Sequence, residues 1–323
     1  MSKYSDKYLI SEWRTAPKRA IRDGVGEALV KIGEDERVVV LSADLAGSTR
    51  VDKFAETFPD RFFELGVAEQ NMAGVAAGVA FTGLIPFMAS YAAFSPGRNW
   101  EQIRISIALS KANVKIIGSH GGVATGKNGP SHQGTEDIAL TRVLPNMTVL
   151  TPADATQCQT MIEAAYKLVG PVYIRTARPE TPNFTKKYDF EIGKIEKYRE
   201  GRDVTICASG IPVWESLMVA EELAKEGVEC EVLNISTIKP LDRETIIESA
   251  RKTNKVITIE DHQIAGGMGS AIAELLGEEY PVPIKRMGIT DKFGLSGEWE
   301  EVYKWFGLDR VSLKKAVVDY LHE

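Results

Sequence analysis

The sequence contains few cysteines and no long hydrophobic run. Its three cysteines, Cys158, Cys207 and Cys230, are too few and too scattered for a disulfide framework or a cysteine-rich metal site. No segment approaches the ~18 consecutive apolar residues of a transmembrane helix. The first residues, MSKYSDKYLISEWRTAPKR, lack the apolar segment of a secretory signal. We therefore expect a cytoplasmic protein with no membrane partner.

The sequence also lacks an excess of positive charge. Its 39 Lys and Arg residues stand against 45 Asp and Glu residues, a formal net charge of -6, and no block of like charge forms a tail. This balance does not favour nucleic-acid binding. Apolar residues make up 44% and charged residues 26% of the 323 residues, which excludes a disordered or fibrous chain. The length favours two domains.

Short β-branched segments alternate with longer amphipathic segments along the chain. We expect strands at 38–41, 114–117, 148–150, 172–174, 204–208, 230–233 and 256–259. We expect helices at 101–109, 155–168, 212–226, 243–252 and 269–276. This alternation is typical of an α/β fold with doubly wound parallel sheets that helices cover on both faces.

The alternation is interrupted after residue 177. The segment that follows holds Pro179, Pro182 and a charged stretch at 186–191, without a strong period. We predict two doubly wound α/β domains, residues 1–182 with an N-terminal extension and residues 201–323, joined by a linker at 183–200.

Two of the four histidines, His120 and His132, lie in one glycine-rich segment, GSHGGVATGKNGPSHQG at 118–134. The segment follows an expected strand, and ligands bind at the carboxyl ends of parallel strands. Glycine lets the backbone approach a ligand closely, and histidine moves protons near neutral pH. We favour a functional loop over a solvated surface loop. No carboxylates or cysteines recur beside the histidines, so we expect no metal site in this chain.

Glu69 precedes a segment of small apolar residues at 73–80. A helix of such residues packs closely on every side, so a carboxylate at its start would be buried and need a partner. Position alone supports a helix cap and a functional acid equally. Tyr91 and Phe94 are interpreted either as core residues or as a flat slot for a planar ring.

Together these motifs resemble the C-terminal half of transketolase and, more distantly, that of 1-deoxyxylulose-5-phosphate synthase. The motifs are SADL (42–45), GVAEQNM (66–72), SHGG (119–122), NGPSHQ (128–133), RP (178–179) and EDH (260–262). The resemblance runs from about residue 15 to the end. It implies a thiamine-diphosphate enzyme with a pyrimidine-binding domain followed by a smaller transketolase C-terminal domain.

The family binds the cofactor's diphosphate and metal through a Gly-Asp-Gly motif in an N-terminal domain, and this sequence contains no such motif. The resemblance thus implies the C-terminal subunit of a split transketolase, which transfers a two-carbon ketol unit from a ketose phosphate to an aldose or its phosphate. An N-terminal partner subunit would hold most of the thiamine diphosphate and its Mg²⁺ (or Ca²⁺ or Mn²⁺). We expect a self-associated dimer of this chain and an α2β2 complex with the partner. The small residues Ala73, Gly74, Ala76, Ala77 and Gly78 would permit a close approach across that interface.

The resemblance also implies roles for individual residues. Glu69 matches the glutamate that hydrogen-bonds the aminopyrimidine ring. His120 and His132 match histidines that contact the substrate's hydroxyls and carbonyl. The remaining cofactor contacts are matched by Asp44, Leu45, Tyr91 and Phe94. The groups that bind the sugar phosphate are matched by Arg22, Ser48 and Arg178, with Arg175 as an alternative to Arg178.

One substrate position departs from the family. Asn128 stands where transketolase has an aspartate that contacts a sugar hydroxyl, so the substrates need not be the usual pentose-phosphate pair. Three alternatives stay open: a split 1-deoxyxylulose-5-phosphate synthase-like subunit, the β subunit of a 2-oxo-acid dehydrogenase, and a non-catalytic subunit that kept the fold. The two histidine motifs disfavour the first two, and intact Glu69, His120 and His132 disfavour the third.

Overall fold

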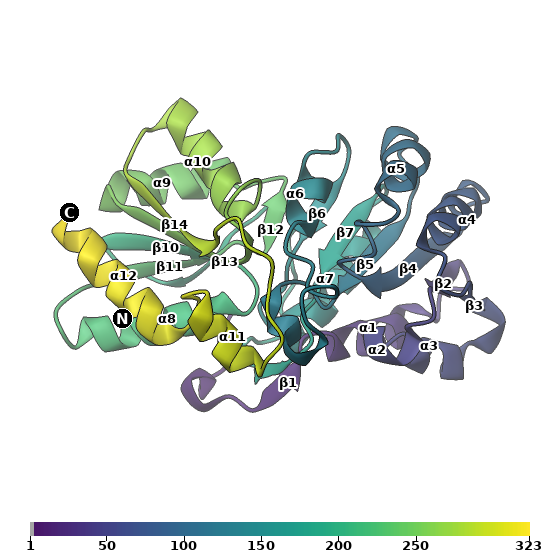
Figure 1. Cartoon of the computed structure of the whole chain (residues 1–323), viewed down its shortest axis with the longest axis horizontal. Helices are drawn as coiled ribbons and strands as arrows, with labels where there is room; N and C mark the ends of the chain where they lie inside the picture. Colours follow the sequence, from purple (N-terminus) through teal and green to yellow (C-terminus); the bar gives the residue numbers. More distant parts are fainter. Residues whose placement is uncertain (1–2) are drawn as a thin grey trace.

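The computed structural model describes residues 3–323, which form two α/β halves side by side (Figure 1). The first half contains a seven-stranded sheet in the order β12-β6-β7-β5-β4-β2-β3. Its strands are β2 (Val38–Ser42), β3 (Phe62–Glu64), β4 (Ile85–Tyr91), β5 (Lys115–Ser119), β6 (Thr148–Leu150), β7 (Val172–Arg175) and β12 (Thr237–Lys239). All neighbours are parallel except β12, which pairs antiparallel with β6.

The helices of the first half alternate with these strands. They are α1 (Asp23–Ile32), α2 (Ala46–Thr49), α3 (Asp52–Thr57), α4 (Glu69–Phe81), α5 (Trp100–Gln102), α6 (Asp137–Arg142) and α7 (Ala155–Lys167). The 3-10 helices are η1 (Trp13–Thr15), η2 (Pro59–Arg61) and η4 (Val123–Asn128), and η3 (Ile103–Leu109) is a π-helix. A separate antiparallel pair joins β1 (Lys18–Ala20) to β8 (Glu180–Pro182).

The second half contains a five-stranded sheet in the order β14-β13-β10-β11-β9. The strands are β9 (Glu196–Arg199), β10 (Val204–Ala208), β11 (Cys230–Asn234), β13 (Val256–Gln263) and β14 (Ile284–Ile289). The helices are α8 (Pro212–Ala224), α9 (Arg243–Thr253), α10 (Met268–Glu279), α11 (Trp299–Trp305) and α12 (Arg310–His322). The predicted α/β class with two doubly wound sheets is confirmed.

Alternate residues of the central strands supply two cores, one on each face of the first sheet. Val38 and Val40 of β2 pack in the same core as α1 and α7, whereas Val39 and Leu41 pack in the core that includes α4 and η3. A strand that is buried on both faces is apolar at every position, and all five residues of β2 are buried. This explains why short continuous apolar runs marked these strands in the sequence.

The two halves are joined by more than a single linker, because segments of each half pair or pack with the other. The predicted linker at 183–200 ends in β9, which is an edge strand of the second sheet, so this part of it has regular structure. In return, β12 leaves the second half and extends the first sheet. The N-terminal extension packs on the second half, where Tyr4 pairs with Arg199 and the Trp214 indole donates to the carbonyl of Trp13. The domain boundaries themselves stay a prediction.

The predicted helix at 101–109 is only partly α-helical. It begins as α5 and continues as η3, a π-helix. The remaining predicted helices overlap α7, α8, α9 and α10. None of the helices among residues 3–323 is long and apolar enough to span a membrane.

A buried carboxyl, Glu196, lies where the halves meet. Its oxygens accept hydrogen bonds from the hydroxyls of Tyr188 (2.9 Å) and Ser236 (2.7 Å) and from the amide of Asn234 (3.2 Å). Because burial outweighs these bonds, the pKa of Glu196 rises from 4.5 to about 7. The folded state therefore binds more protons than the unfolded state between these two values.

We predict that this carboxyl lowers the stability of the protein as the pH rises from about 4.5 to about 7. The contribution is at most about 3.5 kcal/mol, because each pKa unit corresponds to about 1.4 kcal/mol. Glu196→Gln has no titrating group at this position. The free energy of unfolding of the variant, minus that of the wild type, should therefore increase as the pH rises across this range. Denaturant unfolding of both proteins at pH 5, 6, 7 and 8 measures the difference. A difference that stays constant with pH would contradict the prediction.

Candidate active site

The residues singled out in the sequence gather at one edge of the first sheet. Strands β7, β5, β4, β2 and β3 are consecutive neighbours and run parallel, so their carboxyl ends lie together. Each end contributes a residue that the sequence analysis named: Asp44 and Leu45 after β2, Glu69 after β3, Tyr91 at the end of β4, His120 after β5 and Arg178 after β7. Parallel α/β sheets bind their ligands at this edge.

Glu69 begins α4, and its side chain is fully buried. Its Oε2 accepts a hydrogen bond of 2.6 Å from Nη1 of Arg98, whose side chain is 47% exposed. Its Oε1 is buried and has no hydrogen-bond partner. The carboxylate therefore does not cap α4. A buried acceptor without a partner costs about 1–3 kcal/mol, which makes this oxygen a candidate contact for a ligand.

Two aromatic rings and two histidines form one ring cluster. The imidazole of His120 stacks on Tyr91 with centroids 3.8 Å apart, and Phe94 stacks on the same tyrosine at 5.8 Å. His132 meets both aromatic rings edge-on, at 5.9 Å from Tyr91 and 5.4 Å from Phe94. The Arg98 guanidinium lies 4.9 Å above Phe94, which connects the cluster to Glu69. Tyr91 is largely buried and contacts these rings, so the core and flat-slot interpretations of the two aromatics both stay open.

His120 is buried among positive charges. Its Nδ1 contacts the hydroxyl of Ser119 at 3.0 Å, and its Nε2 lies 3.5 Å from Nη1 of Arg22. Burial lowers the pKa of His120 to about 3, helped by the charges of Arg22 and Arg178. The imidazole is therefore neutral at physiological pH, with one nitrogen able to donate and the other to accept a hydrogen bond.

Several guanidinium groups converge beside His120. Arg22 Nη1 donates to the carbonyl of Ser48 at 2.7 Å, and its buried Nε has no partner. Arg178 makes a long hydrogen bond of 3.4 Å to the carbonyl of Thr125. Arg50, which the sequence analysis did not name, pairs with Asp23 at 2.8 Å. Burial and the charges of Arg50 and Arg178 lower the pKa of Arg22, and the nearby carboxylate of Asp23 only partly opposes this shift.

Asp44 is held by a residue that sequence reasoning missed, whereas the N–H of Leu45 donates to the hydroxyl of Ser42 at 3.2 Å. Oε1 of Glu64 accepts hydrogen bonds from the backbone N–H groups of Asp44 (2.6 Å), Leu65 (3.1 Å) and Gly66 (3.3 Å). One carboxylate oxygen therefore ties the turn after β2 to the turn before Glu69. The signal available in the sequence was a glutamate at the end of a short apolar run, two residues before Gly66.

The structure separates the two candidate phosphate ligands Arg175 and Arg178. Arg175 is buried, and its Nε forms an ion pair of 2.9 Å with Asp137. The structure therefore favours Arg178 over Arg175 for a phosphate, and both assignments stay predictions. Asn128 is exposed at the end of η4, and its neighbour Lys127 pairs with Glu298 of the second half at 2.5 Å.

No group of three or more His, Cys, Asp or Glu side chains within residues 3–323 is arranged to hold a metal ion. The absence of a metal site from the complete chain stays a prediction.

Two family models match the chain. The model described as "Transketolase, pyrimidine binding domain" matches residues 17–183, and that described as "Transketolase, C-terminal domain" matches residues 193–313. The chain therefore belongs to the transketolase family and comprises these two domains, as the motifs indicated. Dependence on thiamine diphosphate follows from this membership.

Relatives of similar length share the whole arrangement. The chain is 42% identical over 298 residues to a 6-deoxy-6-sulfo-D-fructose transketolase subunit of Clostridium sp. (strain MSTE9), covering 92% of each chain. It is 34% identical over 305 residues to an apulose-4-phosphate transketolase subunit of Phocaeicola vulgatus, covering 94% of this chain and 97% of that one. A solved structure titled "Split gene transketolase, inactive beta4 tetramer" matches with a TM-score of 0.86 and 44% identity, covering 95% of this chain and 99% of that one.

We predict that the His120 ring signals of the free subunit do not titrate between pH 5 and 8, because its pKa is about 3. Histidine-labelled NMR spectra, assigned by comparison with His120→Gln, measure this. Arg178→Gln removes one of the repelling charges and should raise the pKa toward its ordinary value. A wild-type midpoint near pH 6.5, or a lower midpoint in Arg178→Gln, would contradict the electrostatic assignment.

Proposed function

We propose that this chain is the catalytic C-terminal subunit of a split transketolase, which transfers a two-carbon ketol unit from a ketose phosphate to an aldose or its phosphate. The observation that carries the proposal is the buried, unpartnered Oε1 of Glu69 beside a cluster of aromatic and histidine rings. The names of the relatives support the subunit organisation, since chains of similar length are described as transketolase subunits.

The residues present fit one end of thiamine diphosphate. The aminopyrimidine offers a ring nitrogen, and Glu69 Oε1 is a buried polar atom without a partner. Tyr91 and Phe94 supply flat surfaces that would exclude water from an aromatic ring. When bound, the cofactor supplies a nucleophilic carbon and an electron sink. In this proposal Glu69 holds a proton at Oε1 toward the pyrimidine nitrogen, and Asp44 and Leu45 line the cofactor side of the slot.

The other end of the cofactor needs groups that this sequence does not offer. The sequence contains no Gly-Asp-Gly motif, so we assign the diphosphate and its divalent cation, Mg²⁺ or alternatively Ca²⁺ or Mn²⁺, to an N-terminal partner subunit.

The sugar side of the site fits a polyhydroxylated anion. Neutral His120 and its partner His132 would donate and accept hydrogen bonds with the substrate's hydroxyls and carbonyl. Arg22, Ser48 and Arg178 would bind the terminal phosphate, and guanidinium groups suit such an anion because they present paired donors. Exposed Asn128 would contact a sugar hydroxyl. No observation favours the 1-deoxyxylulose-5-phosphate synthase-like alternative.

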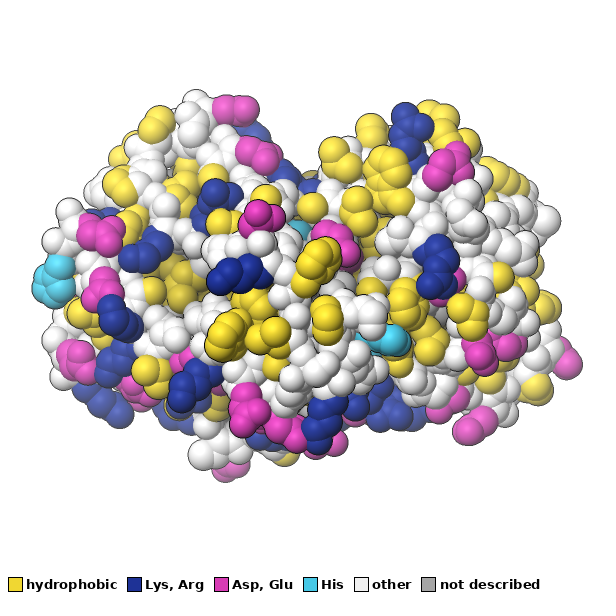
Figure 2. Space-filling view, viewed as in Figure 1, with side chains coloured by type: hydrophobic (Ala, Val, Ile, Leu, Met, Phe, Trp, Pro, Cys, Tyr) yellow, Lys and Arg dark blue, Asp and Glu magenta, His cyan; other side chains and the backbone are white. Residues whose placement is uncertain are grey.

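An exposed apolar face supports assembly with a second chain. Val75 and Phe81 on α4 and Ile105 and Leu109 on η3 are exposed, and α4 packs against η3. Figure 2 shows hydrophobic side chains over the end of the molecule where α4 and α5 lie in Figure 1. Large apolar patches of this kind mark interfaces. We propose that this face forms a dimer of this chain and, with the partner, an α2β2 complex.

The sequence analysis assigned too many residues of α4 to that interface. Ala73, Ala76 and Ala77 are buried in the subunit's own core, against the first sheet. Gly74 and Gly78 are exposed, and a Cβ built on either would meet no atom within 4 Å. Only these two glycines of the five named residues are open to a second chain.

We predict that the chain alone has no ketol-transfer activity and that a partner subunit with thiamine diphosphate and Mg²⁺ restores it. Glu69→Gln should then lower the turnover of the reconstituted complex by at least about 100-fold, because a glutamine cannot exchange the proton. Hydrogen–deuterium exchange at C2 of the bound thiamine is the direct measurement, and exposed Glu56→Gln on α3 is the control. Robust turnover by the chain alone would refute the split organisation. Unchanged C2 exchange in Glu69→Gln would refute the role of Glu69.

We predict that Gly78→Arg prevents self-association without unfolding the chain, because its side chain would project into open space on the proposed interface. Gly277→Arg on α10 is a matched control, since it is also a helical glycine with no atom within 4 Å of a built Cβ. Sedimentation velocity should show dimers or larger assemblies for the wild type and for Gly277→Arg, and monomers for Gly78→Arg. A monomeric wild type at micromolar concentration would contradict the proposed face.

A further inference from the structure

The second domain contributes none of the residues assigned above, yet one of its carboxylates is bonded directly to the loop that carries His120. Asp261, near the end of β13, is buried. Its Oδ1 accepts the backbone N–H of Val123 at 2.8 Å, and its Oδ2 accepts that of Ala124 at 3.1 Å. Tyr303 of α11 donates its hydroxyl to the same Oδ2 at 3.0 Å. The carboxylate thus binds the first turn of η4, three residues after His120.

The backbone around His120 depends on this contact. His120 has φ of +59° and Gly122 has φ of +80°, both in the left-handed region. A Cβ built on Gly122 would lie 2.2 Å from the Asp261 carboxylate. The Thr125 hydroxyl in turn donates to the carbonyl of His120 at 2.7 Å. The carboxylate therefore lies where a side chain on residue 122 would be. Through the hydrogen bond of Thr125, the position of η4 also restrains the backbone of His120.

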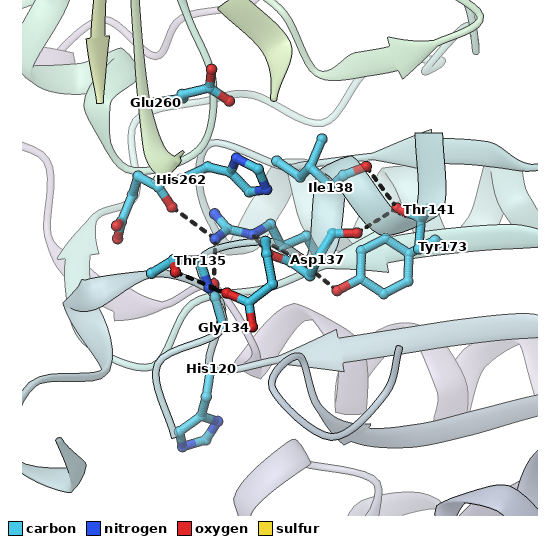
Figure 3. Close-up of polar contacts among 12 residues, drawn as sticks. His120, Gly134, Thr135, Asp137, Ile138, Thr141, Tyr173, Glu260 and His262 are labelled. Atoms are coloured by element: carbon cyan, nitrogen blue, oxygen red, sulfur yellow. Dashed lines mark hydrogen bonds and ion pairs between the residues drawn. The ribbon is translucent and has the colours of Figure 1, made fainter. Parts of the chain in front are cut away.

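A buried arginine fixes the other end of the same loop. Nη2 of Arg175 donates to the carbonyl of Gly134 at 3.0 Å and to that of Asp261 at 2.8 Å, while its Nε pairs with Asp137. Figure 3 shows Asp137 in the middle of this network and Tyr173 to its right, with Glu260 and His262 of the second domain above and His120 below. The loop that carries both histidines is consequently held at both ends by groups that contact the second domain.

We propose that Asp261 is a positioning residue for the reaction: by holding the N–H groups of Val123 and Ala124, it sets the conformation of His120 toward the sugar substrate. This inference rests on the proposed function. It gives the second domain a role in substrate handling, distinct from the role of Glu69 on the cofactor. A displacement of about 1 Å in a catalytic group costs on the order of 100-fold in rate.

The neighbouring Glu260 provides a matched control. It is also buried, and its two oxygens also accept two backbone N–H groups, from Met268 at 2.7 Å and Gly269 at 2.8 Å. These amides belong to α10 in the second domain itself. Glu260→Gln and Asp261→Asn therefore make the same chemical change, because each replaces one carboxylate oxygen, an acceptor, with an amide NH2 group. Only Asp261→Asn releases the histidine loop.

The test uses the complex reconstituted with the partner subunit, thiamine diphosphate and Mg²⁺. Asp261→Asn should lower kcat/KM for the ketose donor on the order of 10- to 100-fold while C2 exchange in the bound thiamine stays within about 2-fold of wild type, because no bond to Glu69 changes. Amide exchange of the peptide that contains residues 121–126 should become faster. Glu260→Gln should change none of these values by more than about 3-fold, within the range of a small structural perturbation.

Each other outcome overturns the inference. Wild-type kcat/KM in Asp261→Asn would show that the contact does not set the geometry of His120. Equal losses of donor turnover and C2 exchange in both variants would show a general structural role. If Asp261→Asn does not fold, Tyr303→Phe replaces it, since it removes only the hydroxyl that holds Oδ2 of Asp261 in place. A wild-type complex without any ketol transfer would instead refute the proposed function, whatever the variants do.

Discussion

The buried guanidinium of Arg175 is the interaction on which the arrangement of the site depends. It joins three segments that are far apart in the sequence: Asp137 at the start of α6, Gly134 at the end of the histidine loop, and Asp261 in the second sheet. A buried charge is tolerated only where its donors are satisfied by such partners. Loss of Asp137 would leave the charge without its bonded counter-ion, and loss of either carbonyl would leave a buried donor unsatisfied, so the network fixes both the loop and the contact between the domains.

In contrast to this network, some buried side-chain oxygen and nitrogen atoms of the described residues have no hydrogen-bond partner. Glu69 Oε1 and Arg22 Nε are both buried without partners, and both lie at the carboxyl edge of the first sheet. Native structures leave few such groups, because each costs stability. Glu69 is directed at the cofactor side of the slot in our proposal, and Arg22 at the anionic end of the sugar. These two buried, unpartnered atoms therefore lie where the proposed cofactor and sugar phosphate would bind.

The local chemistry of the site could be predicted from the sequence because each residue follows an apolar strand. Asp44, Glu69, Tyr91 and His120 are marked by the runs before them, and parallel topology brings the strand ends together. The partners that orient these residues could not be predicted. Arg98 lies 29 residues from Glu69 in the sequence, and nothing in the pattern around it indicates which carboxylate it contacts.

Contacts between the domains escaped the sequence analysis for a related physical reason. Strand β12 has only three residues and joins a sheet of the other half, so its pairing depends on tertiary structure rather than on local periodicity.

Asp261 stood in a motif that sequence reasoning found but left without a role. Its contact with the histidine loop becomes visible only when Val123 and Ala124 are brought to it across the domain boundary. A buried carboxylate that accepts N–H groups from another domain couples the position of its own sheet to them. In this protein those N–H groups lie three and four residues from His120, so under the proposed function the relative placement of the two domains would help to determine how the sugar is held.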